Sequence, residues 1–454
     1  MTEKADVLVI GAGMAGLSAA NRLVDDNLNT KLKVVVLEGR DRVGGRVNTA
    51  SMGDGGSQKV DIGGMWLQHP SKNPVRRYLK GVEQLETPTS SIAIYDEDGN
   101  EFDGAKISKI QADMIKQAAS SDRVVSMSDP ALKLLEVMPA LGQDQIEAGD
   151  VAKKNTDERL AAIMLRGMVE NYTASSIEQL TGYMANYIGV GGDFIPPQNV
   201  LKEGFCVAYD ALAEGLGVRL EHVVTRIEIL DDGGNVKVTT KDGKLFEAQK
   251  VIVTLPLGVL KSGSVEFVPP LPERKQLAIK RIGFGLLNKV VLRFPSIFWK
   301  KDVHFLNCAT PDRSEVSMFL NLSEIGYPIL VGFHQGLAAL ENEKLSDDDL
   351  KEKAMVVLRR MYGPTIPEPI EVVCTRWGTD PMSLGSYTAP HVLEGGIDLD
   401  DATVLAEPIG KSVYFAGEAV SKQPGLIHGA YNSGIRAAGD VERDGLTIAA
   451  SSGH

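Results

Sequence analysis

The sequence contains few cysteines and no long apolar run. Its three cysteines, Cys206, Cys308 and Cys374, are widely spaced, cannot all pair with one another and form no CxxC metal or redox motif. This usage fits an intracellular, reducing compartment. No run of about 18 apolar residues occurs, so no membrane span is predicted. The start, MTEKADVLVIGAG, lacks the regions of a signal peptide, and the end, AASSGH, carries no recognised anchor, so we expect a cytoplasmic protein.

Basic residues are also scarce relative to acidic ones. The chain carries 48 lysines and arginines against 60 aspartates and glutamates, a formal net charge of -12 at pH 7. The resulting field disfavours nonspecific binding to nucleic acid and attracts cationic ligands. Hydrophobic residues, at 43%, suffice for a sizeable core, and 454 residues exceed what one core normally holds, so we expect two or three domains.

The chain begins with a βαβ unit. A strand over 6–10 is followed by a glycine turn, a helix to about residue 25 and a second strand over 33–38. From about 75 to 200 the pattern predicts helices, and residues 218–255 predict a β-meander that ends in a buried strand. The organisation is that of an α/β protein.

A GxGxxG motif lies in the turn of this βαβ unit. Gly11 allows a tight turn, Gly13 allows the backbone to approach a pyrophosphate, and Gly16 allows the helix to pack closely on the strand. Glu38 ends the second strand, where a carboxylate accepts hydrogen bonds from ribose hydroxyls. The alternative, a glycine-rich turn beside a surface glutamate, does not account for both features in this order.

The segment GRDRVGGRV follows directly. Its two glycines let the backbone pass closely, while Arg42 and Arg46 can meet a phosphate or a flavin edge. A nicotinamide enzyme does not need this element. The βαβ unit followed by RxGGR resembles the FAD-binding signature of flavoproteins with two dinucleotide-binding domains, so the expected cofactor is FAD rather than NAD.

Two later segments end in predicted helices. One helix is capped by Ser346 and closed by Gly363. In the tail, VYFAGEAVSKQPGLIHGAYNSGIRAA reads strand, turn, helix, so the amides near Ile427 and His428 would stabilise the negative charge of a reduced flavin. No cysteine lies near Gln423, which predicts a flavin held without a covalent link.

The sequence resembles the flavin-containing amine oxidases, most closely the branch of polyamine oxidases and lysine-specific histone demethylases. The resemblance rests on the blocks above and on four others, VDIGGMW, VIVTLPLGVLKSG, GFGLLNKVVLRF and RWGTDPMSLGSY. The resemblance covers both ends and the middle of the chain. It implies a two-domain flavoprotein with a Rossmann-type FAD-binding domain of residues 1–75, 200–262 and 390–454. An α+β substrate domain with a mixed sheet would comprise residues 76–199 and 263–389.

The resemblance also implies the chemistry and the site. A small cationic amine would lose hydride to flavin N5, the imine would hydrolyse, and O2 would reoxidise the flavin to give hydrogen peroxide. Lys289 would be catalytic through a water near N5, and Gln68, Tyr387 and Leu426 would contact substrate. The implied cofactor residues are Gly11, Gly13, Ala15, Gly16, Glu38, Gly39, Arg40, Gly44, Gly45, Arg46, Gly63, Gly64, Met65, Trp66, Val224, Trp377, Gly417, Glu418, Leu426 and Ile427.

Lys289 is unusual within its own strand. Leucines and valines surround it in GFGLLNKVVLRF, and such surroundings disfavour the charged form and lower the pKa of a lysine. A readily deprotonated amine could hold a water and assist proton transfer. The alternative is a strand lysine whose amine reaches solvent.

The sequence departs from the family pattern at the substrate pocket. Tyr387 supplies one aromatic wall, but Leu426 stands where the second aromatic residue is usual. Gln68 replaces an acid or histidine, His69 is displaced by one residue, and Trp66 has an ordinary core role as its alternative. Acidic partners for a distal ammonium would come from Glu170, Glu178, Asp193 or Glu203.

Alternative functions follow from these departures. An L-amino-acid oxidase or desaturase would need an arginine for the substrate carboxylate or a broad apolar cavity, and neither can be assigned. A histone-demethylase-like protein or a non-catalytic flavin-bearing protein is the alternative from another class. The sequence shows no added DNA-binding module and no long helical insertion.

Overall fold

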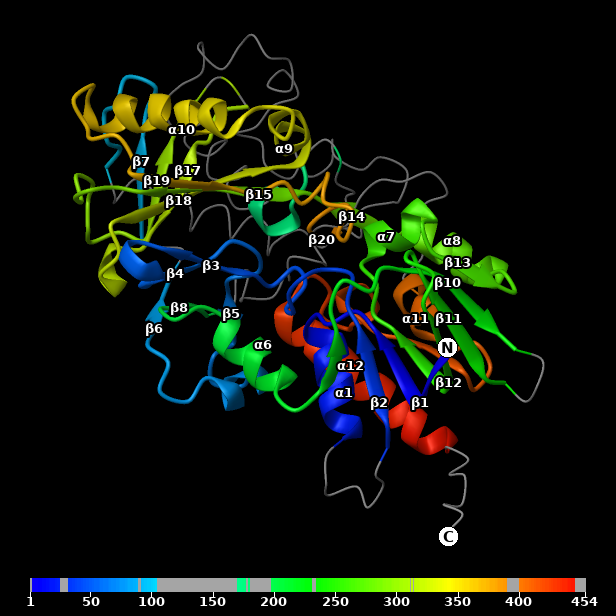
Figure 1. Cartoon of the computed structure of the whole chain (residues 1–454). Helices are drawn as coiled ribbons and strands as arrows, with labels where there is room; N and C mark the ends of the chain where they lie inside the picture. Colours follow the sequence, from blue (N-terminus) through cyan, green and yellow to red (C-terminus); the bar gives the residue numbers. More distant parts are fainter. Residues whose placement is uncertain are drawn as a thin grey trace, which may run out of the picture.

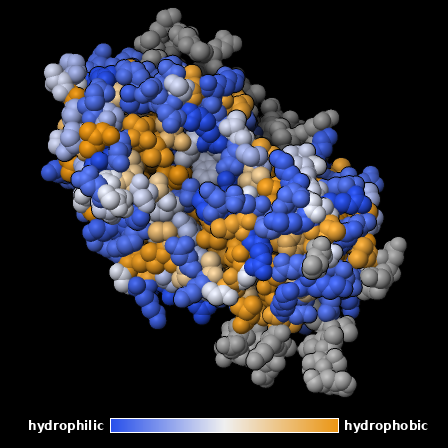
Figure 2. All heavy atoms as spheres, in the orientation of Figure 1, coloured by the Kyte–Doolittle hydropathy of each residue, from blue (hydrophilic) through white to orange (hydrophobic). Residues whose placement is uncertain are grey.

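The computed structural model describes residues 2–24, 32–88, 91–103, 170–176, 179, 197–230, 234–310, 312, 314–389 and 400–445. Two lobes are visible in Figure 1, each built around one large sheet. Among the described residues, no helix is long and apolar enough to cross a membrane. The face shown in Figure 2 is mainly hydrophilic, with separate apolar patches.

An eight-stranded sheet forms the lobe that contains the amino terminus. Its strands run in the order β13-β10-β11-β12-β1-β2-β9, and β21 also pairs with β12. Their bounds are β1 Thr2–Ile10, β2 Val34–Leu37, β9 Gly217–Arg219, β10 Val224–Ile229, β11 Val236–Thr240, β12 Leu245–Val253, β13 Glu266–Val268 and β21 Val413–Phe415. The central pairs, β1 with β2 and β1 with β12, are parallel, as a Rossmann-type domain requires.

Burial on both faces explains why the second half of β1, residues 7–10, is continuously apolar. Val7, Leu8 and Val9 are fully buried, which is typical of a parallel strand covered on both sides. Helices α1 (Met14–Leu23) and α12 (Ile427–Asp444) lie side by side and contribute to the core cluster on one face. The predicted βαβ unit is therefore present, with α1 ending at Leu23 and α12 beginning at Ile427.

A six-stranded mixed sheet forms the second lobe, in the order β19-β15-β18-β17-β16-β7. Its strands are β7 Ile92–Tyr95, β15 Leu287–Arg293, β16 Phe305–Cys308, β17 Met318–Asn321, β18 Ile329–Gln335 and β19 Glu371–Cys374. Helix α10 (Asp347–Tyr362) covers one face, and Ser346 caps it by accepting a hydrogen bond from the Asp349 amide. The other face packs against β3 (Thr49–Met52) and β4 (Gln58–Asp61), which puts Lys289 of β15 between the lobes.

Shorter elements complete the described fold. The remaining strands are β5 Leu67–Gln68, β6 Gln84–Glu86, β8 Gln198–Leu201, β14 Gly283–Gly285 and β20 Tyr387–Ala389. The remaining helices are α6 Cys206–Ala213, α7 Leu257–Ser262, α8 Glu273–Arg281, α9 Gly336–Asn342, α11 Asp401–Ala406, and the 3-10 turns Asp54–Gly56, Pro74–Tyr78, Ser323–Ile325 and Glu418–Val420.

The structure corrects part of the helical prediction for residues 75–200. β6, β7 and the start of β8 fall within this range, and β7 pairs in parallel with β16 at the edge of the six-stranded sheet. These short strands form because they pair with strands distant in the sequence, and local periodicity does not reveal such pairing. The predicted helices over most of 104–196 lie outside the described residues. Strand β13 belongs to the eight-stranded sheet although it follows the domain boundary predicted at 262.

Candidate functional site

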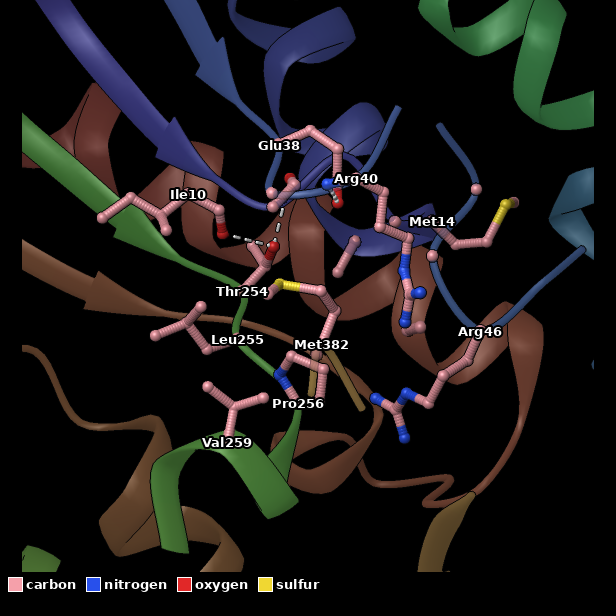
Figure 3. A pocket seen from close by; sticks show the side chains of 18 of the residues that line it. Ile10, Met14, Glu38, Arg40, Arg46, Thr254, Leu255, Pro256, Val259 and Met382 are labelled. Atoms are coloured by element: carbon pink, nitrogen blue, oxygen red, sulfur yellow. Dashed lines mark hydrogen bonds between the residues drawn. The ribbon is translucent and has the colours of Figure 1, made fainter. Parts of the chain in front are cut away.

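A cavity of about 370 Å³, here called the cofactor cavity, opens at the carboxyl ends of β1 and β2 (Figure 3). Crevices at this edge of a parallel sheet are the usual position of nucleotide ligands. The structure brings most predicted site residues together there. Those that line it are Gly11, Gly13, Ala15, Glu38, Gly39, Arg40, Gly44, Gly45, Arg46, Gly64, Val224, Tyr387, Gly417, Glu418, Leu426 and Ile427.

The three glycines of the first turn have different surroundings. Gly11 has a φ of +104°, which a side chain rarely adopts, so it provides the turn. A methyl group on Gly16 would lie 1.8 Å from the carbonyl oxygen of Gly11, so this position requires the close packing of α1 on the turn. A methyl group on Gly13 would meet only the Gly44 carbonyl oxygen, at 3.9 Å. Gly13 therefore presents an open backbone to the cofactor cavity.

Glu38 is held at the edge of the cofactor cavity by backbone amides. Its carboxylate accepts hydrogen bonds from the Ala12 amide at 2.7 Å and from the Arg40 amide at 2.9 Å. The side chain is buried. A carboxylate has about four acceptor sites, so two remain for hydroxyl donors. Figure 3 shows Glu38 after β2 and Thr254 after β12, the two strands that flank β1.

Arginine and carboxylate pairs fix the opposite wall. Arg46 donates to Glu418 at 2.8 Å, and the buried Glu418 also accepts from the Thr388 hydroxyl at 2.7 Å and the Gly425 amide at 2.9 Å. Arg40 pairs with Asp380 at 2.7 Å. Charge-assisted bonds of this kind orient a guanidinium group and keep its remaining donors available.

Lys289 is buried, with 2% of its surface exposed, so its amine does not reach solvent. The Nζ atom donates to the carbonyl oxygens of Asp61 and Gly63, each at 2.7 Å, and lies 3.0 Å from the Met65 sulfur. The amine therefore contacts the VDIGGM segment that leads into the cofactor cavity through Gly64. The reading of Lys289 as a solvated strand lysine is wrong.

Burial shapes the protonation of this region. Desolvation lowers the pKa of Lys289 below its ordinary value, and the nearby Asp61 charge partly opposes this shift. Desolvation also raises the pKa of Asp61, which is opposed by hydrogen bonds from Thr49 and the Phe205 amide. Burial thus moves the pKa values of the two groups toward each other, relative to their ordinary values in water.

Other predicted residues lie beside the cofactor cavity without lining it. Trp377 donates through its backbone to Asn288, and its indole lies near the Ile62 carbonyl oxygen. The Trp66 ring packs 6.2 Å from that of Phe305, which is the core role considered as its alternative. The remaining residues of this group are Gly16, Gly63, Met65, Gln68 and Lys289.

The predicted substrate wall is partly defined. The Tyr387 hydroxyl donates to the Asn171 carbonyl oxygen at 2.7 Å, which fixes the ring in the cavity wall beside Leu426. Gln68 is buried and its Oε1 atom has no hydrogen-bond partner among the described residues. His69 lies edge-on to His428 at 6.4 Å. Of the four candidate acids, Glu178 and Asp193 lie outside the described residues.

Several residues of the site were not predicted, among them Thr254, Met382 and Asp61. Thr254 follows β12 and donates to the Ile10 carbonyl oxygen at 2.8 Å, and Met382 also lines the cavity. Asp61 is the charged neighbour of Lys289. Thr254 lies in VIVTLP and Asp61 in VDIGG, both blocks that carried the resemblance, so the motifs located them without giving their contacts.

The cavity fits a flavin dinucleotide. Gly13 leaves room for a phosphate at the start of α1, Glu38 offers acceptors for ribose, and the amino end of α12 at Ile427 faces the same space. Among the described residues, no cluster of histidine, cysteine, aspartate and glutamate could hold a metal ion. The three cysteines are free.

Comparisons with known proteins agree with this geometry. Residues 14–442 match the family described as flavin containing amine oxidoreductase. The chain is 35% identical over 457 residues to lysine-specific histone demethylase 1 homolog 2 of Arabidopsis thaliana, covering 96% of this chain and 58% of that protein. It is 33% identical over 455 residues to polyamine oxidase 2 of the same plant, covering 97% of this chain and 88% of that protein.

A solved structure supports the fold. A putrescine oxidase double mutant redesigned for cofactor binding superposes with a TM-score of 0.72 at 22% identity, covering 98% of this chain and 100% of that one. The chain spans only a little over half the length of the demethylase homologue, 58%.

Proposed function

Because the chain belongs to the family of flavin-containing amine oxidoreductases, we propose that it oxidises a C–N bond of a polyamine or related alkyl amine, with O2 as acceptor. FAD is the cofactor, and we propose that it is held without a covalent link. The overall reaction would convert amine, water and O2 into an aldehyde, a shorter amine and hydrogen peroxide. Bound FAD supplies the two-electron acceptor for the carbon next to the nitrogen.

The position of Lys289 is the observation that carries this proposal. Its buried amine lies between the six-stranded sheet and the segment that enters the cofactor cavity. Burial lowers the pKa of Lys289, so the amine can hold or release a proton at Nζ near neutral pH. Proton transfer at this atom would serve substrate deprotonation or hydrolysis of the oxidised product.

The cofactor residues have a separate task. In the proposal, Glu38 accepts the ribose hydroxyls, the open backbone at Gly13 accommodates the phosphates, and the Arg46 guanidinium, oriented by Glu418, orients the reactive part of the cofactor. Tyr387 and Leu426 would bound the substrate pocket. The shortage of basic residues, with a net charge of -12, favours capture of a cationic amine.

A peroxide-coupled panel of amines tests the proposal. Holoenzyme is incubated with spermine, spermidine, their acetyl forms and simple alkyl amines, and products are identified by mass spectrometry. We expect peroxide and an aldehyde from at least one polyamine, with bleaching of the flavin by the same amine under anaerobic conditions. If no amine yields peroxide or bleaches the flavin, the proposal is overturned.

A second candidate is oxidation of a methylated lysine side chain. It is favoured by the 35% identity to the plant histone demethylase homologue over 96% of this chain. A dimethyl-lysine peptide in the same panel separates the two functions, because formaldehyde would be its product. Formaldehyde release without turnover of free polyamines would favour this candidate.

A further inference from the structure

A loop that follows β19 forms part of the wall of the cofactor cavity. It comprises residues 375–386, between β19 and β20, and is here called the wall loop. The residues of this loop that line the cofactor cavity are Pro381, Met382 and Ser386. The Cζ atom of Arg40, another lining residue, lies 6.0 Å from the centre of the Trp377 ring in the same loop. The position of the wall loop therefore sets part of the shape that FAD meets.

The wall loop leaves the six-stranded sheet beside Lys289. Backbone pairing between β15 and β19 ends at Val290 and Cys374. One residue further on, the Thr375 amide donates to the Lys289 carbonyl oxygen at 3.0 Å. In return, the Lys289 amide donates to the Thr375 hydroxyl, at 2.8 Å, instead of to a backbone carbonyl. Side chains thus take over from the backbone ladder where the chain departs to line the cofactor cavity.

Asn288 makes the central contacts at this point. Its Oδ1 atom accepts hydrogen bonds from the Trp377 amide at 2.9 Å and from the Thr375 hydroxyl at 3.1 Å. Its Nδ2 atom donates to Oε1 of Glu343, the residue after α9, at 2.7 Å. The same Glu343 oxygen accepts from the Gly378 amide at 2.7 Å. Two side chains from outside the wall loop therefore hold its first four residues.

These contacts lie behind Lys289, on the other face of the sheet. Successive side chains of a strand point to opposite faces. Asn288 shares a face with Val290, which packs in one core cluster with α10, whereas the Lys289 amine reaches the Gly63 carbonyl oxygen on the opposite face. Asn288 and Glu343 are buried, and neither is among the described residues that line the cofactor cavity. Any effect of theirs on FAD must pass through the wall loop or the backbone of Lys289.

The polar chemistry of Asn288 and Glu343 is costly in this place. Burying an amide and a carboxylate costs free energy unless both are hydrogen-bonded, and apolar side chains of similar size would avoid that cost beside the apolar cluster. A connected set of buried hydrogen bonds instead fixes one arrangement of the backbone. The backbone groups fixed here are the amides of Trp377 and Gly378. This favours a role in placing the wall loop over a role in packing.

We propose that Asn288 and Glu343 are positioning residues for the cofactor site, which hold the start of the wall loop so that FAD meets a preformed wall kept in register with Lys289. The inference goes beyond the proposed amine oxidation, because it concerns how the chain holds and orients FAD. It does not depend on which amine is oxidised.

Glu343→Leu and Glu343→Gln form a matched pair that tests the proposal. Leucine has a similar volume but cannot accept from the Gly378 amide, whereas glutamine keeps one acceptor oxygen. Among the described residues, Oε2 of Glu343 has no hydrogen-bond partner, so the glutamine amide breaks no bond there. Apoprotein is titrated with FAD, and the visible circular dichroism of the bound flavin is recorded. In Glu343→Leu we expect Kd for FAD to rise about tenfold and the dichroism to change, with Glu343→Gln close to wild type.

Asn321→Leu is the control for a loss of stability in the same sheet. Asn321 is buried in β17 and bonds to the Trp299 indole and the Val303 carbonyl oxygen, outside the wall loop. We expect a lower free energy of unfolding with unchanged Kd and dichroism. The proposal is overturned if Asn321→Leu and Glu343→Leu change Kd equally, if Glu343→Leu binds FAD as wild type does, or if Glu343→Gln is as weak as Glu343→Leu. If Glu343→Leu does not fold, Glu343→Asp, which withdraws the carboxylate by one methylene group, replaces it under the same criteria.

A double variant shows whether the two residues act together. Asn288→Leu alone should also raise Kd for FAD about tenfold. Residues that act through one network are not additive, so the double variant Asn288→Leu/Glu343→Leu should remain near tenfold. A loss near a hundredfold would mean two independent effects and would overturn the shared network.

The FAD measurements also separate this proposal from the proposed function, because they need no amine. Weaker FAD binding and altered dichroism in Glu343→Leu, in a protein that oxidises no amine, would support the positioning role and refute the proposed function. Wild-type FAD binding and dichroism in Glu343→Leu, in a protein that oxidises a polyamine, would overturn the positioning role and leave the function intact.

Discussion

Lys289 is the residue at which the two lobes and the proposed chemistry meet. Its amine is fully enclosed, and its hydrogen-bond acceptors are the Asp61 and Gly63 carbonyl oxygens. Lys289→Met approximately keeps the length of the side chain but removes the amine that can carry a proton. We expect FAD content to be retained and flavin reduction or reoxidation to slow about 100-fold, the lower range of general acid–base effects. Stopped-flow absorbance of the flavin measures both steps.

The control for this variant is another buried lysine. Lys250 lies in β12 of the eight-stranded sheet, and its amine donates to the Lys411 carbonyl oxygen, which precedes β21 of the same sheet. Lys250→Met should leave both flavin steps unchanged. If Lys289→Met behaves in the same way, Lys289 only joins the lobes and has no part in catalysis.

At the scale of elements, the β1–α1 turn separates packing from cofactor binding. Gly16→Ala places a methyl group 1.8 Å from the Gly11 carbonyl oxygen, and we expect a loss of about 3 kcal/mol or more in the free energy of unfolding. Gly13→Ala meets no atom closer than 3.9 Å. We expect the free energy of unfolding of Gly13→Ala to lie within about 1 kcal/mol of the wild-type value. We expect its affinity for FAD to be at least tenfold weaker.

Urea unfolding of the apoprotein and titration with FAD measure the two effects. Equal losses of stability in both variants would show that Gly13 is also a packing position. Unchanged FAD affinity in Gly13→Ala would argue against a phosphate at this turn.

The amino end of α12 predicts a dependence on pH. Burial, helped by His69, lowers the pKa of His428 to about 4, while an unfolded histidine titrates near 6.5. Between these values the unfolded chain binds more protons, so stability falls as the pH drops from about 6.5 to 4. His428→Gln, which keeps an acceptor for the Asn73 amide, should show a smaller loss across this window.

Thermal unfolding of the FAD-bound protein at several pH values checks this expectation. Burial also lowers the pKa of His334, so this residue adds to the loss of stability at low pH. Its contribution is the same in wild type and in His428→Gln, so it does not affect the comparison. Parallel stability curves for His428→Gln and wild type would contradict the assignment.

The same elements show what sequence patterns can and cannot predict. The strand, turn and helix around Gly11, Gly13 and Gly16 were predictable because backbone geometry demands glycine there. The helix after Ser346 was predictable from its cap. β7 was missed because it is stabilised by pairing with β16, far along the chain. The pairing of Lys289 with Phe333 of β18 depends on the register between two strands, which periodicity does not give.

At the scale of the whole molecule, the net charge of -12 should affect substrate capture. We expect kcat/KM for spermine to fall several-fold as NaCl rises from about 20 to 200 mM, because salt screens long-range attraction. The fall should be steeper for spermine than for hexylamine, which carries less charge. Steady-state assays at constant pH measure it, and identical slopes for the two amines would exclude steering by the overall field.

The hydrogen bonds of Lys289 also have a mechanical consequence. They connect β15 of the six-stranded sheet with the segment that precedes the cofactor cavity, at the point where the proposed reaction occurs. Relative movement of the lobes must lengthen these bonds or carry the whole segment along. A movement that separates this segment from β15 would therefore change the environment of the amine, which is the group that handles the proton in the proposed function.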